Sequence, residues 1–466
     1  MAIQSLAQLA SRQPLKKMGD KPTSKLPAKN PTTSYWLTQP HHLASYRSSE
    51  TTPEEVDVAI IGTGLAGTSI AYHILSQSEN GSEPKVALFE ARQACSGATG
   101  RNGGHVKVQV PSLQRVSKKY DAATAQELFS WVSSQRIAIK TTVEQEGIDC
   151  DLLVTRSFDA YFDAAQAAEV KAFVEEQRQS GATWTQDVQW FEGPNLERNT
   201  GIKGLAAAAS VPVVSLWPYK FVTALLERAV EMGAFLYTET PVEAAETGDD
   251  GIVTLKTSRG TVRAKKVIYA TNGYTSALLP QYEGVIVPVR GQNSILVPLA
   301  KSHHPHPSNT CNLFHSPKAV DYLIPRPDGN IILGGGTAAY RKDMEDRNPK
   351  WFDTVDDTTL INESVKAHFD RTMAECFRGW EDAEARAAMT WTGIMGYTPD
   401  GAPHMGRVPG TENQWILAGF NGGGMSLIFT ATQEIARMVL QGIELEETSI
   451  PKIFKTTEDR LETKFA

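Results

Sequence analysis

The residues whose spacing points most directly to chemistry are three glycines, Gly62, Gly64 and Gly67, in the stretch Gly-Thr-Gly-Leu-Ala-Gly. They follow the apolar run Val-Asp-Val-Ala-Ile-Ile at 56–61 and precede a helical pattern. In that setting the first glycine permits a tight turn, the second lets the backbone approach a pyrophosphate, and the third lets the helix pack against the strand. The free N–H groups at the start of the helix attract the same anion. The motif therefore predicts a dinucleotide site.

An acidic residue follows where such a site needs one. Glu90 ends a second apolar run, at 85–90, and lies 26 residues after Gly64. The common gap is about 20 residues, and the polar loop at 76–84 accounts for the difference. A carboxylate here would accept hydrogen bonds from ribose hydroxyls and repel a 2′-phosphate, which argues against NADP and fits either NAD or FAD.

Two glycine-rich loops favour FAD over NAD. Residues 96–104 read Ser-Gly-Ala-Thr-Gly-Arg-Asn-Gly-Gly, and His105 follows them. A small, polar loop of this kind can lend backbone groups to a long ligand, whereas an NAD enzyme would commonly continue with a helix. The stretch Gly-Phe-Asn-Gly-Gly-Gly at 419–424 precedes the last helical pattern. It would aim a second helix N-terminus at the negative edge of a reduced flavin.

Other chemistries have less support. No GxSxG motif supports Ser/His/Asp hydrolysis. The four cysteines show no CxxC or zinc spacing, so we expect reduced thiols in an intracellular protein. A cluster of three histidines lies among prolines without further ligands at a suitable spacing, so we expect no metal site. These residues are Cys95, Cys150, Cys311 and Cys376, and His303, His304 and His306.

Composition and charge limit the partners. The chain has 466 residues, with 46 basic and 53 acidic side chains and a net charge of −7. That field repels phosphate backbones, so we expect no nucleic-acid partner. No apolar run reaches the roughly 18–20 residues of a membrane span.

We expect a cytoplasmic protein. Residues 1–19 carry Arg12, Lys16 and Lys17 without acids, which leaves a mitochondrial location as the alternative.

Strand and helix patterns alternate from Val56 onward, which predicts an α/β fold. Between about 285 and 333 the helical patterns fade, which indicates an antiparallel sheet. We therefore predict a Rossmann-type FAD-binding domain with an inserted antiparallel-sheet substrate domain. The FAD-binding domain would be built from three separate segments (51–120, 206–284 and 386–445). The other expected segments are an N-terminal arm (1–50), a mixed, largely substrate-domain segment (121–205), the substrate domain (285–385) and a C-terminal tail (446–466).

These motifs together resemble the FAD-dependent D-amino-acid oxidase superfamily, which includes glycine, sarcosine and γ-glutamylputrescine oxidases. The likeness runs from Thr-Ser-Tyr-Trp at 33–36 to about Leu440 and is greatest toward the γ-glutamylputrescine oxidase branch. Besides the loop at 96–104, it rests on Ala-Thr-Asn-Gly-Tyr at 270–274, Pro-Val-Arg-Gly-Gln at 288–292 and Thr-Pro-Asp-Gly at 398–401.

The resemblance implies an enzyme that oxidises a small primary or secondary amine or amino acid. Hydride would pass to flavin N5, the imine product would hydrolyse, and oxygen or another electron acceptor would reoxidise the flavin. Three alternatives stay open at this point. They are a FAD-dependent dehydrogenase of a non-amine substrate, an NAD-dependent dehydrogenase, and a non-catalytic FAD-binding protein.

The resemblance also implies roles for named residues. The glycine motif, with Leu65 and Ala66, would surround the pyrophosphate. Glu90 and Ala91 would hold the adenosine ribose, and Val242 would contact adenine through its backbone. The residues expected near the flavin ring are Arg101, Asn102, Gly103 and Gly104. Those expected to border the nucleotide are Ala270, Asn272 and Gly273. Those expected at the pyrimidine end of the ring are Gly419, Asn421, Gly422, Gly423, Gly424 and Met425.

Departures from the family pattern bear on how FAD is held. The sarcosine oxidase branch attaches FAD to a cysteine where this chain has Thr390, and the dimethylglycine dehydrogenase branch uses a histidine where Arg101 stands. We therefore expect non-covalent FAD, with His105 as a minor covalent candidate. Sarcosine oxidases carry an oxygen-activating lysine in the strand that matches Asn-Ile-Ile-Leu at 330–333, where this chain has none. Both an oxidase and a dehydrogenase therefore remain open.

Four residues are candidates for substrate contact or catalysis: His105, Tyr322, Arg326 and Trp391. Flavin amine oxidation needs no side-chain base, because the cofactor performs the difficult step and the protein orients the substrate. Each candidate also has a structural interpretation. The two aromatic side chains could pack beneath a strand, Arg326 could form an ion pair, and His105 could make a loop hydrogen bond.

Overall fold

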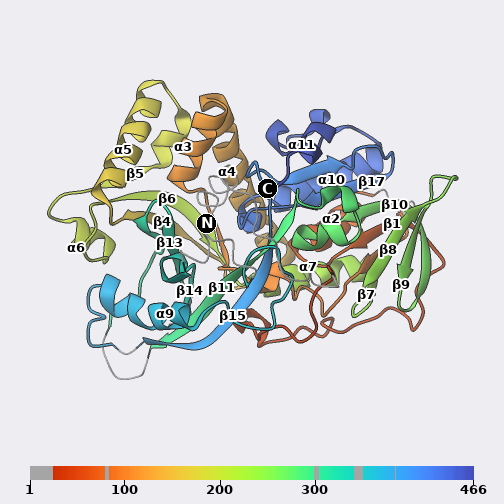
Figure 1. The fold of residues 1–466 in the computed structure, drawn as a ribbon, viewed down its shortest axis with the longest axis horizontal. Helices are drawn as coiled ribbons and strands as arrows, with labels where there is room; N and C mark the ends of the chain where they lie inside the picture. Colours follow the sequence, from red (N-terminus) through yellow and green to blue (C-terminus); the bar gives the residue numbers. More distant parts are fainter. Residues whose placement is uncertain (1–24, 79–82, 299–303, 341–349, 384, 466) are drawn as a thin grey trace.

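The computed structural model describes residues 25–78, 83–298, 304–340, 350–383 and 385–465. Two sheets lie side by side along its long axis (Figure 1). In spatial order, the first holds β16 (His404–Arg407), β17 (Gln414–Ala418), β10 (Gly260–Tyr269), β1 (Glu55–Ile61), β2 (Val86–Phe89) and β7 (Phe235–Tyr237), and the hairpin of β8 (Val242–Thr247) and β9 (Val253–Thr257) extends β10.

The centre of the first sheet is parallel: β1 lies between β10 and β2, and all three run the same way. Its strands are apolar runs such as Val58 to Ile61, because a parallel sheet is covered on both faces. Helices α2 (Leu65–Gln77), α7 (Pro218–Glu231) and α10 (Phe429–Gln441) pack against one another over it. Ile60, Ile70 and Ile435 lie in the shared core.

The second sheet is mainly antiparallel. In spatial order it holds β15 (Ala385–Tyr397), β11 (Val287–Pro298), β14 (Ile331–Gly334), β13 (Ala319–Pro325), β12 (Thr310–Ser316), β4 (Leu153–Tyr161), β6 (Ala207–Ser215) and β3 (His105–Val106), and β5 (Gln189–Phe191) pairs with β6. The pair of β12 and β4 is parallel, and the other pairs are antiparallel.

Further helices connect and cover the strands of the two sheets. The α-helices are α3 (Val110–Lys119), α4 (Ala122–Glu146), α5 (Ala164–Gln179), α6 (Leu196–Thr200), α9 (Glu363–Cys376) and α11 (Glu458–Glu462). The 3-10 helices are η1 (Tyr35–Leu37), η2 (Ala98–Arg101), η3 (Thr183–Asp187), η4 (Asn272–Ala277), η5 (Pro280–Tyr282), η6 (Gly424–Ser426), η7 (Leu445–Glu447) and η8 (Lys452–Phe454). None of the helices in the described ranges is long and apolar enough to span a bilayer.

The expected fold class is confirmed: a Rossmann-type parallel sheet accompanies a mainly antiparallel one. Two expected segments contribute to both sheets. The segment 206–284 begins with β6, and 386–445 begins inside β15, and both strands belong to the second sheet. β6 is buried along almost its whole length, so its sequence resembles that of a parallel strand. We propose that the FAD-binding domain resumes at about 216 and 398.

Residues near both chain ends are buried in the described structure. Trp36 is fully buried, and its Nε1 donates a hydrogen bond to the carbonyl of Asn102 at 2.6 Å. Ile450 and Phe454 are buried in the core of the first sheet. The basic pattern at 1–19 lies outside the described residues.

The turn between β1 and α2 yields a prediction about stability. A Cβ added to Gly67 would lie 1.9 Å from the carbonyl oxygen of Gly62, so alanine would push α2 away from β1. We expect Gly67→Ala to lower the free energy of unfolding by about 3 kcal/mol, the upper part of the range for overpacking, as measured by urea denaturation. Gly97→Ala is the control, because a Cβ there meets nothing within 4 Å. Equal stability of the two variants would contradict this account of the turn.

Candidate active site

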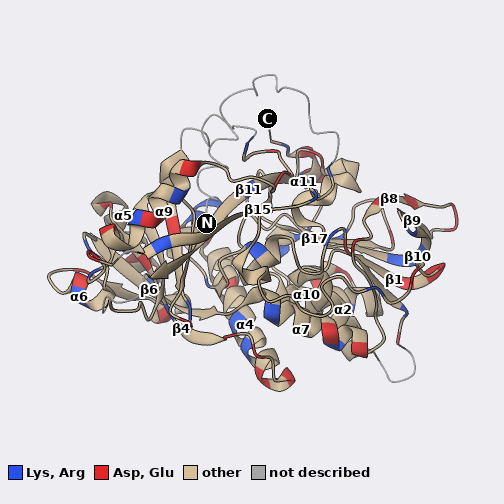
Figure 2. Ribbon diagram, turned by 90° about the horizontal axis from the view of Figure 1, so that it is seen from below, with Lys and Arg blue, Asp and Glu red and all other residues tan. Residues whose placement is uncertain are grey.

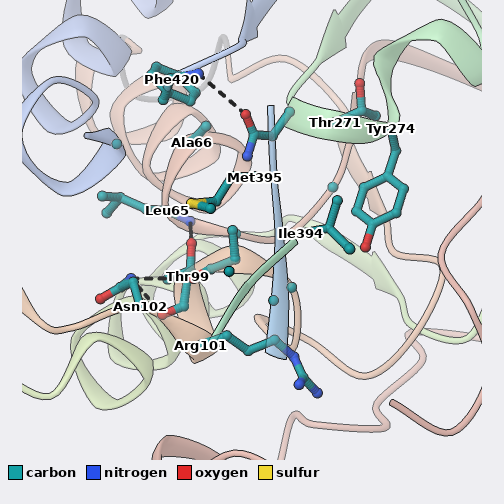
Figure 3. A pocket seen from close by; sticks show the side chains of 18 of the residues that line it. Leu65, Ala66, Thr99, Arg101, Asn102, Thr271, Tyr274, Ile394, Met395 and Phe420 are labelled. Atoms are coloured by element: carbon teal, nitrogen blue, oxygen red, sulfur yellow. Dashed lines mark hydrogen bonds between the residues drawn. The ribbon is translucent and has the colours of Figure 1, made fainter. Parts of the chain in front are cut away.

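A long cavity lies where the two sheets meet, with about 1770 Å³ of empty space including the solvent at its mouth. Its walls come from the carboxyl ends of β1, β2 and β10 on one side and from β11, β13 and β15 on the other. Sites for drug-sized ligands typically measure about 300–1,000 Å³, so this first cavity has room for a longer molecule. Figure 3 shows part of its lining, with Leu65 and Asn102 on one side and Ile394 and Tyr274 on the other.

The glycine motif forms one end of the first cavity. Gly62 and Gly64 line it, and Gly64 is the N-cap of α2. Gly62 has φ of +105°, a conformation that glycine adopts freely. The first N–H of α2, from Leu65, donates to the hydroxyl of Thr99 at 2.9 Å. The N-terminus of the helix and the flavin loop at 96–104 thus lie together at the cavity wall.

Glu90 is held in place by backbone groups. One carboxylate oxygen accepts hydrogen bonds from the N–H and the hydroxyl of Thr63, at 3.0 and 2.8 Å, and the other accepts from the N–H of Arg92 at 3.0 Å. Each oxygen of a carboxylate can accept more than one hydrogen bond. Glu90 lines the first cavity beside Val242, so acceptors for a sugar hydroxyl are available there.

Arg101 fixes the flavin loop rather than offering its charge to the cavity. Its Nε donates to the carbonyl of Ser96 at 2.8 Å, and its Nη1 donates to the carbonyls of Thr32 and Thr392 at 2.7 and 2.8 Å. The guanidinium points away from Leu65 and Met395 in Figure 3. Burial lowers the pKa of Arg101 to about 10. The side chain therefore joins the loop, the arm and β15.

The predicted cofactor residues fall into three groups. Most of them line the first cavity: Gly62, Gly64, Leu65, Ala66, Glu90, Ala91, Arg101, Asn102, Val242, Ala270, Asn272, Gly422, Gly424 and Met425. Gly103, Gly104 and Gly423 line a second cavity beside it. Gly67, Gly273, Gly419 and Asn421 line neither and support the walls. The Asn421 side chain accepts a hydrogen bond from the Thr398 N–H at 2.9 Å, for example.

Two of the four catalytic candidates contact a cavity. Tyr322 lines the first cavity and donates its hydroxyl hydrogen to the Asn293 side chain, and burial raises its pKa. His105 lines the second cavity with a half-buried ring. Its Nδ1 atom is buried without a hydrogen-bond partner in the described part of the chain, and burial lowers the pKa of His105 well below its ordinary value. The ring is therefore neutral at pH 7.

Arg326 and Trp391 line neither of these two cavities, and a contact of either residue with substrate stays a prediction. Arg326 is 1% exposed, pairs with Asp151 at 2.7 Å and lies over the ring of Trp36 at 5.1 Å. Trp391 is fully buried and donates its Nε1 hydrogen to the carbonyl of Arg101 at 2.9 Å.

Several lining residues were not predicted. Tyr340, Tyr397, Gln292 and Asn293 form the wall of the first cavity on the second sheet, together with Met395. Gly393, Met395 and Tyr397 alternate along β15 and therefore share a face. That alternation was visible in the sequence, but the partner strand that makes this face a cavity wall was not.

The second cavity, of about 1690 Å³ with its open side, adjoins the first. The two share a border of four residues: Asn102, Phe420, Gly422 and Met425. On the far side of this border the second cavity is lined by His105, Lys107 and the α3 residues Ser112 and Arg115. The Lys107 ammonium group is buried and donates hydrogen bonds to Asp159 and Ser157, at 2.8 and 2.6 Å. These four residues therefore form a wall common to both cavities.

A cluster of His315, Asp321 and His368 supports the wall of the first cavity from behind. Both histidines place Nε2 on the same oxygen of Asp321, at 3.0 and 2.6 Å, while the other oxygen accepts the N–H of Gly336 at 2.6 Å. Burial raises the pKa of Asp321, but the two histidine hydrogen bonds outweigh burial and lower it to about 2.

In the proline-rich loop, the ring of His304 packs on Trp380 with the ring centroids 4.0 Å apart, and His303 lies outside the described residues.

This cluster yields a prediction about pH. The hydrogen bond from His368 to Asp321 raises the pKa of His368. A raised pKa stabilises the fold below the unfolded value of about 6.5, and the contribution is lost as the pH rises through the folded value. We expect His368→Gln to lower the midpoint of thermal unfolding more at pH 6 than at pH 8. His42→Gln, at a 64% exposed side chain, is the control. A larger loss at pH 8 would contradict the assignment.

Comparison with known proteins places the chain in a family. The family model of FAD-dependent oxidoreductases matches residues 57–438. A Rhizobium meliloti protein named "Probable oxidoreductase OrdL" is 25% identical over 391 residues, 80% of each chain. Glycine oxidase of Bacillus licheniformis is 25% identical over 398 residues, 82% of this chain and 93% of its own. The crystal structure of glycine oxidase from Geobacillus kaustophilus has a TM-score of 0.68 at 21% identity, over 87% of this chain and 99% of that one. The expected family is confirmed: the chain belongs to the FAD-dependent oxidoreductases.

Proposed function

We propose that this FAD-dependent oxidoreductase oxidises a small primary or secondary amine or amino acid to an imine, which hydrolyses in water. The observation that carries the proposal is the shared border of the two cavities, at Asn102, Phe420, Gly422 and Met425. One cavity begins at the glycine turn, where a pyrophosphate would bind, and the other shares wall residues with it. That arrangement suits a cofactor and a substrate that react across the border.

The residues of the first cavity fit FAD. A Cβ on Gly64 would lie 3.0 Å from Thr99 Oγ1, so the side chain that glycine lacks would narrow the passage between helix and loop. The carboxylate of Glu90 and the backbone of Val242 would hold the adenosine, and the N-terminus of α2 would hold the pyrophosphate. Asn102, Gly422 and Met425 would lie at the flavin end. When bound, FAD supplies the acceptor for the hydride that leaves the carbon next to the amine nitrogen.

The protein contributes orientation and the exclusion of water. Tyr322 and Asn293 form a hydrogen-bonded pair in the wall, which fixes the direction of both side chains. The ring centroid of His105 lies 6.0 Å from that of Tyr322, and His105 lines the second cavity. Burial lowers the pKa of His105, so the ring is uncharged at neutral pH. We propose that this uncharged ring orients the substrate by contact and does not take up its proton.

We expect the flavin to be bound without a covalent link. Among the described residues that line the first cavity there is no cysteine or histidine. Cys311 is buried in β12 and lines neither cavity. Acid precipitation of the protein should therefore release all the flavin into the supernatant, as measured by its absorbance. Flavin that stays with the pellet would contradict this prediction and point to His105 in the second cavity.

Anaerobic mixing with candidate amines tests the function itself. The substrate must bind unprotonated for hydride to leave the adjacent carbon, so the rate of flavin bleaching should rise with pH. Suitable candidates are polyamines, their γ-glutamyl derivatives, N-methyl amino acids and D-amino acids. An artificial electron acceptor should restore the flavin absorbance, and we expect oxygen alone to do so slowly, since β14 has no lysine. Bleaching by a hydroxy acid or an alcohol, with none by any amine, would overturn the proposal.

A further inference from the structure

The second cavity has an excess of positive charge. Its described lining holds Lys107, Arg115, Lys118 and Lys119 against one acid, Asp400. Three of these lining residues form ion pairs with residues outside the lining. Lys107 pairs with Asp159 at 2.8 Å, Lys118 with Glu169 at 2.7 Å, and Asp400 with Arg460 at 2.7 Å. Arg115 and Lys119 have no carboxylate partner among the residues that the structure describes. Elsewhere on the molecule, acidic and basic residues are interspersed (Figure 2).

Arg115 is the more informative of the two unpaired groups. It lies in α3, one helical turn before the exposed residues Lys118 and Lys119, and its side chain is half-buried. Within the described ranges its one hydrogen bond runs from Nη2 to the hydroxyl of Ser112, at 2.9 Å, so Nε and Nη1 are left for another acceptor. Burial lowers the pKa of Arg115 to about 10, which leaves it charged at neutral pH.

An unpaired guanidinium removed from water is costly, and an anion beside it reduces that cost. The planar fork of a guanidinium matches a carboxylate, which can accept two parallel hydrogen bonds from it. No residue of α3 lines the first cavity, so Arg115 and the shared border of the two cavities occupy different regions of the second cavity. A ligand that reached from Arg115 to the border would carry its anionic group away from the carbon that reacts there.

We propose that Arg115 binds a carboxylate of the substrate, and that the substrate is therefore an amine whose carboxylate is separated by a carbon chain from the carbon that is oxidised. Lys119, at the mouth of the cavity, adds to the attraction without a direct contact. This assignment deepens the proposed function and rests on it. It places the specificity of the enzyme in α3, away from the residues that surround the cofactor.

A matched pair of variants tests the role of Arg115. Arg136 in α4 makes the same contact, from Nη2 to the hydroxyl of Ser133 three residues earlier at 2.9 Å, and lines neither cavity. The probes are hexanoate and the uncharged hexanamide, titrated into the FAD-loaded protein and followed by the change in flavin absorbance. Thermal unfolding with each probe gives a second readout that does not depend on turnover.

We expect Arg115→Gln to weaken hexanoate binding about 10- to 100-fold, the range for losing a hydrogen-bonded charge partner. Hexanamide binding should not change. Arg115→Lys should retain some of the affinity for hexanoate, and Arg136→Gln should retain all of it. Unchanged hexanoate binding in Arg115→Gln, an equal loss for both probes, or a wild-type protein that binds no hexanoate would overturn the proposal. If hexanoate binding depends on Arg115 but no amine bleaches the flavin, the carboxylate site stands and the amine oxidation fails.

Discussion

The site depends on the buried guanidinium of Arg101 and the three carbonyl oxygens that accept its hydrogen bonds. Those carbonyls belong to the flavin loop, the N-terminal arm and β15, segments that are far apart in the sequence. A charge buried in this way must be satisfied by hydrogen bonds and a counter-charge. Asp357, which is fully buried, lies 3.9 Å from Arg101 and 2.9 Å from Arg92. The network therefore holds the two sheets together at the point where the first cavity lies.

The fixed loop gives both cavities a common wall. Because the side chain of Arg101 is directed into the structure, the backbone after it is free to line the space on both sides. Asn102 borders the first and second cavities, and Gly103 and Gly104 border the second. In the first cavity Arg92 pairs with Asp357 and Glu90 accepts three hydrogen bonds, whereas Arg115 in the second cavity has no carboxylate partner among the described residues. The proposed function thereby places cofactor binding at the parallel sheet and substrate selection at α3.

Features that depend on neighbouring residues were predictable from the sequence. The turn at Gly62 and Gly64, the helix after it and the acid at Glu90 follow from one contiguous pattern, and the structure has all of them. Features that depend on distant partners were not. β6 and β15 join the second sheet through pairings with strands far along the chain, and Arg326 turns inward because Asp151 and Trp36 are there to receive it. Arg115 carries no motif, and only the folded cavity reveals that no carboxylate of the described residues pairs with it.

A crystal structure of the purified protein with its cofactor tests the division between the two cavities most directly. We expect continuous density for FAD through the first cavity, with the adenosine beside Glu90 and Val242 and the flavin ring at the border formed by Asn102 and Gly422. The second cavity should open onto the ring and be free to take a substrate. A flavin ring that lies in the second cavity, or a different nucleotide in the first, would contradict this division.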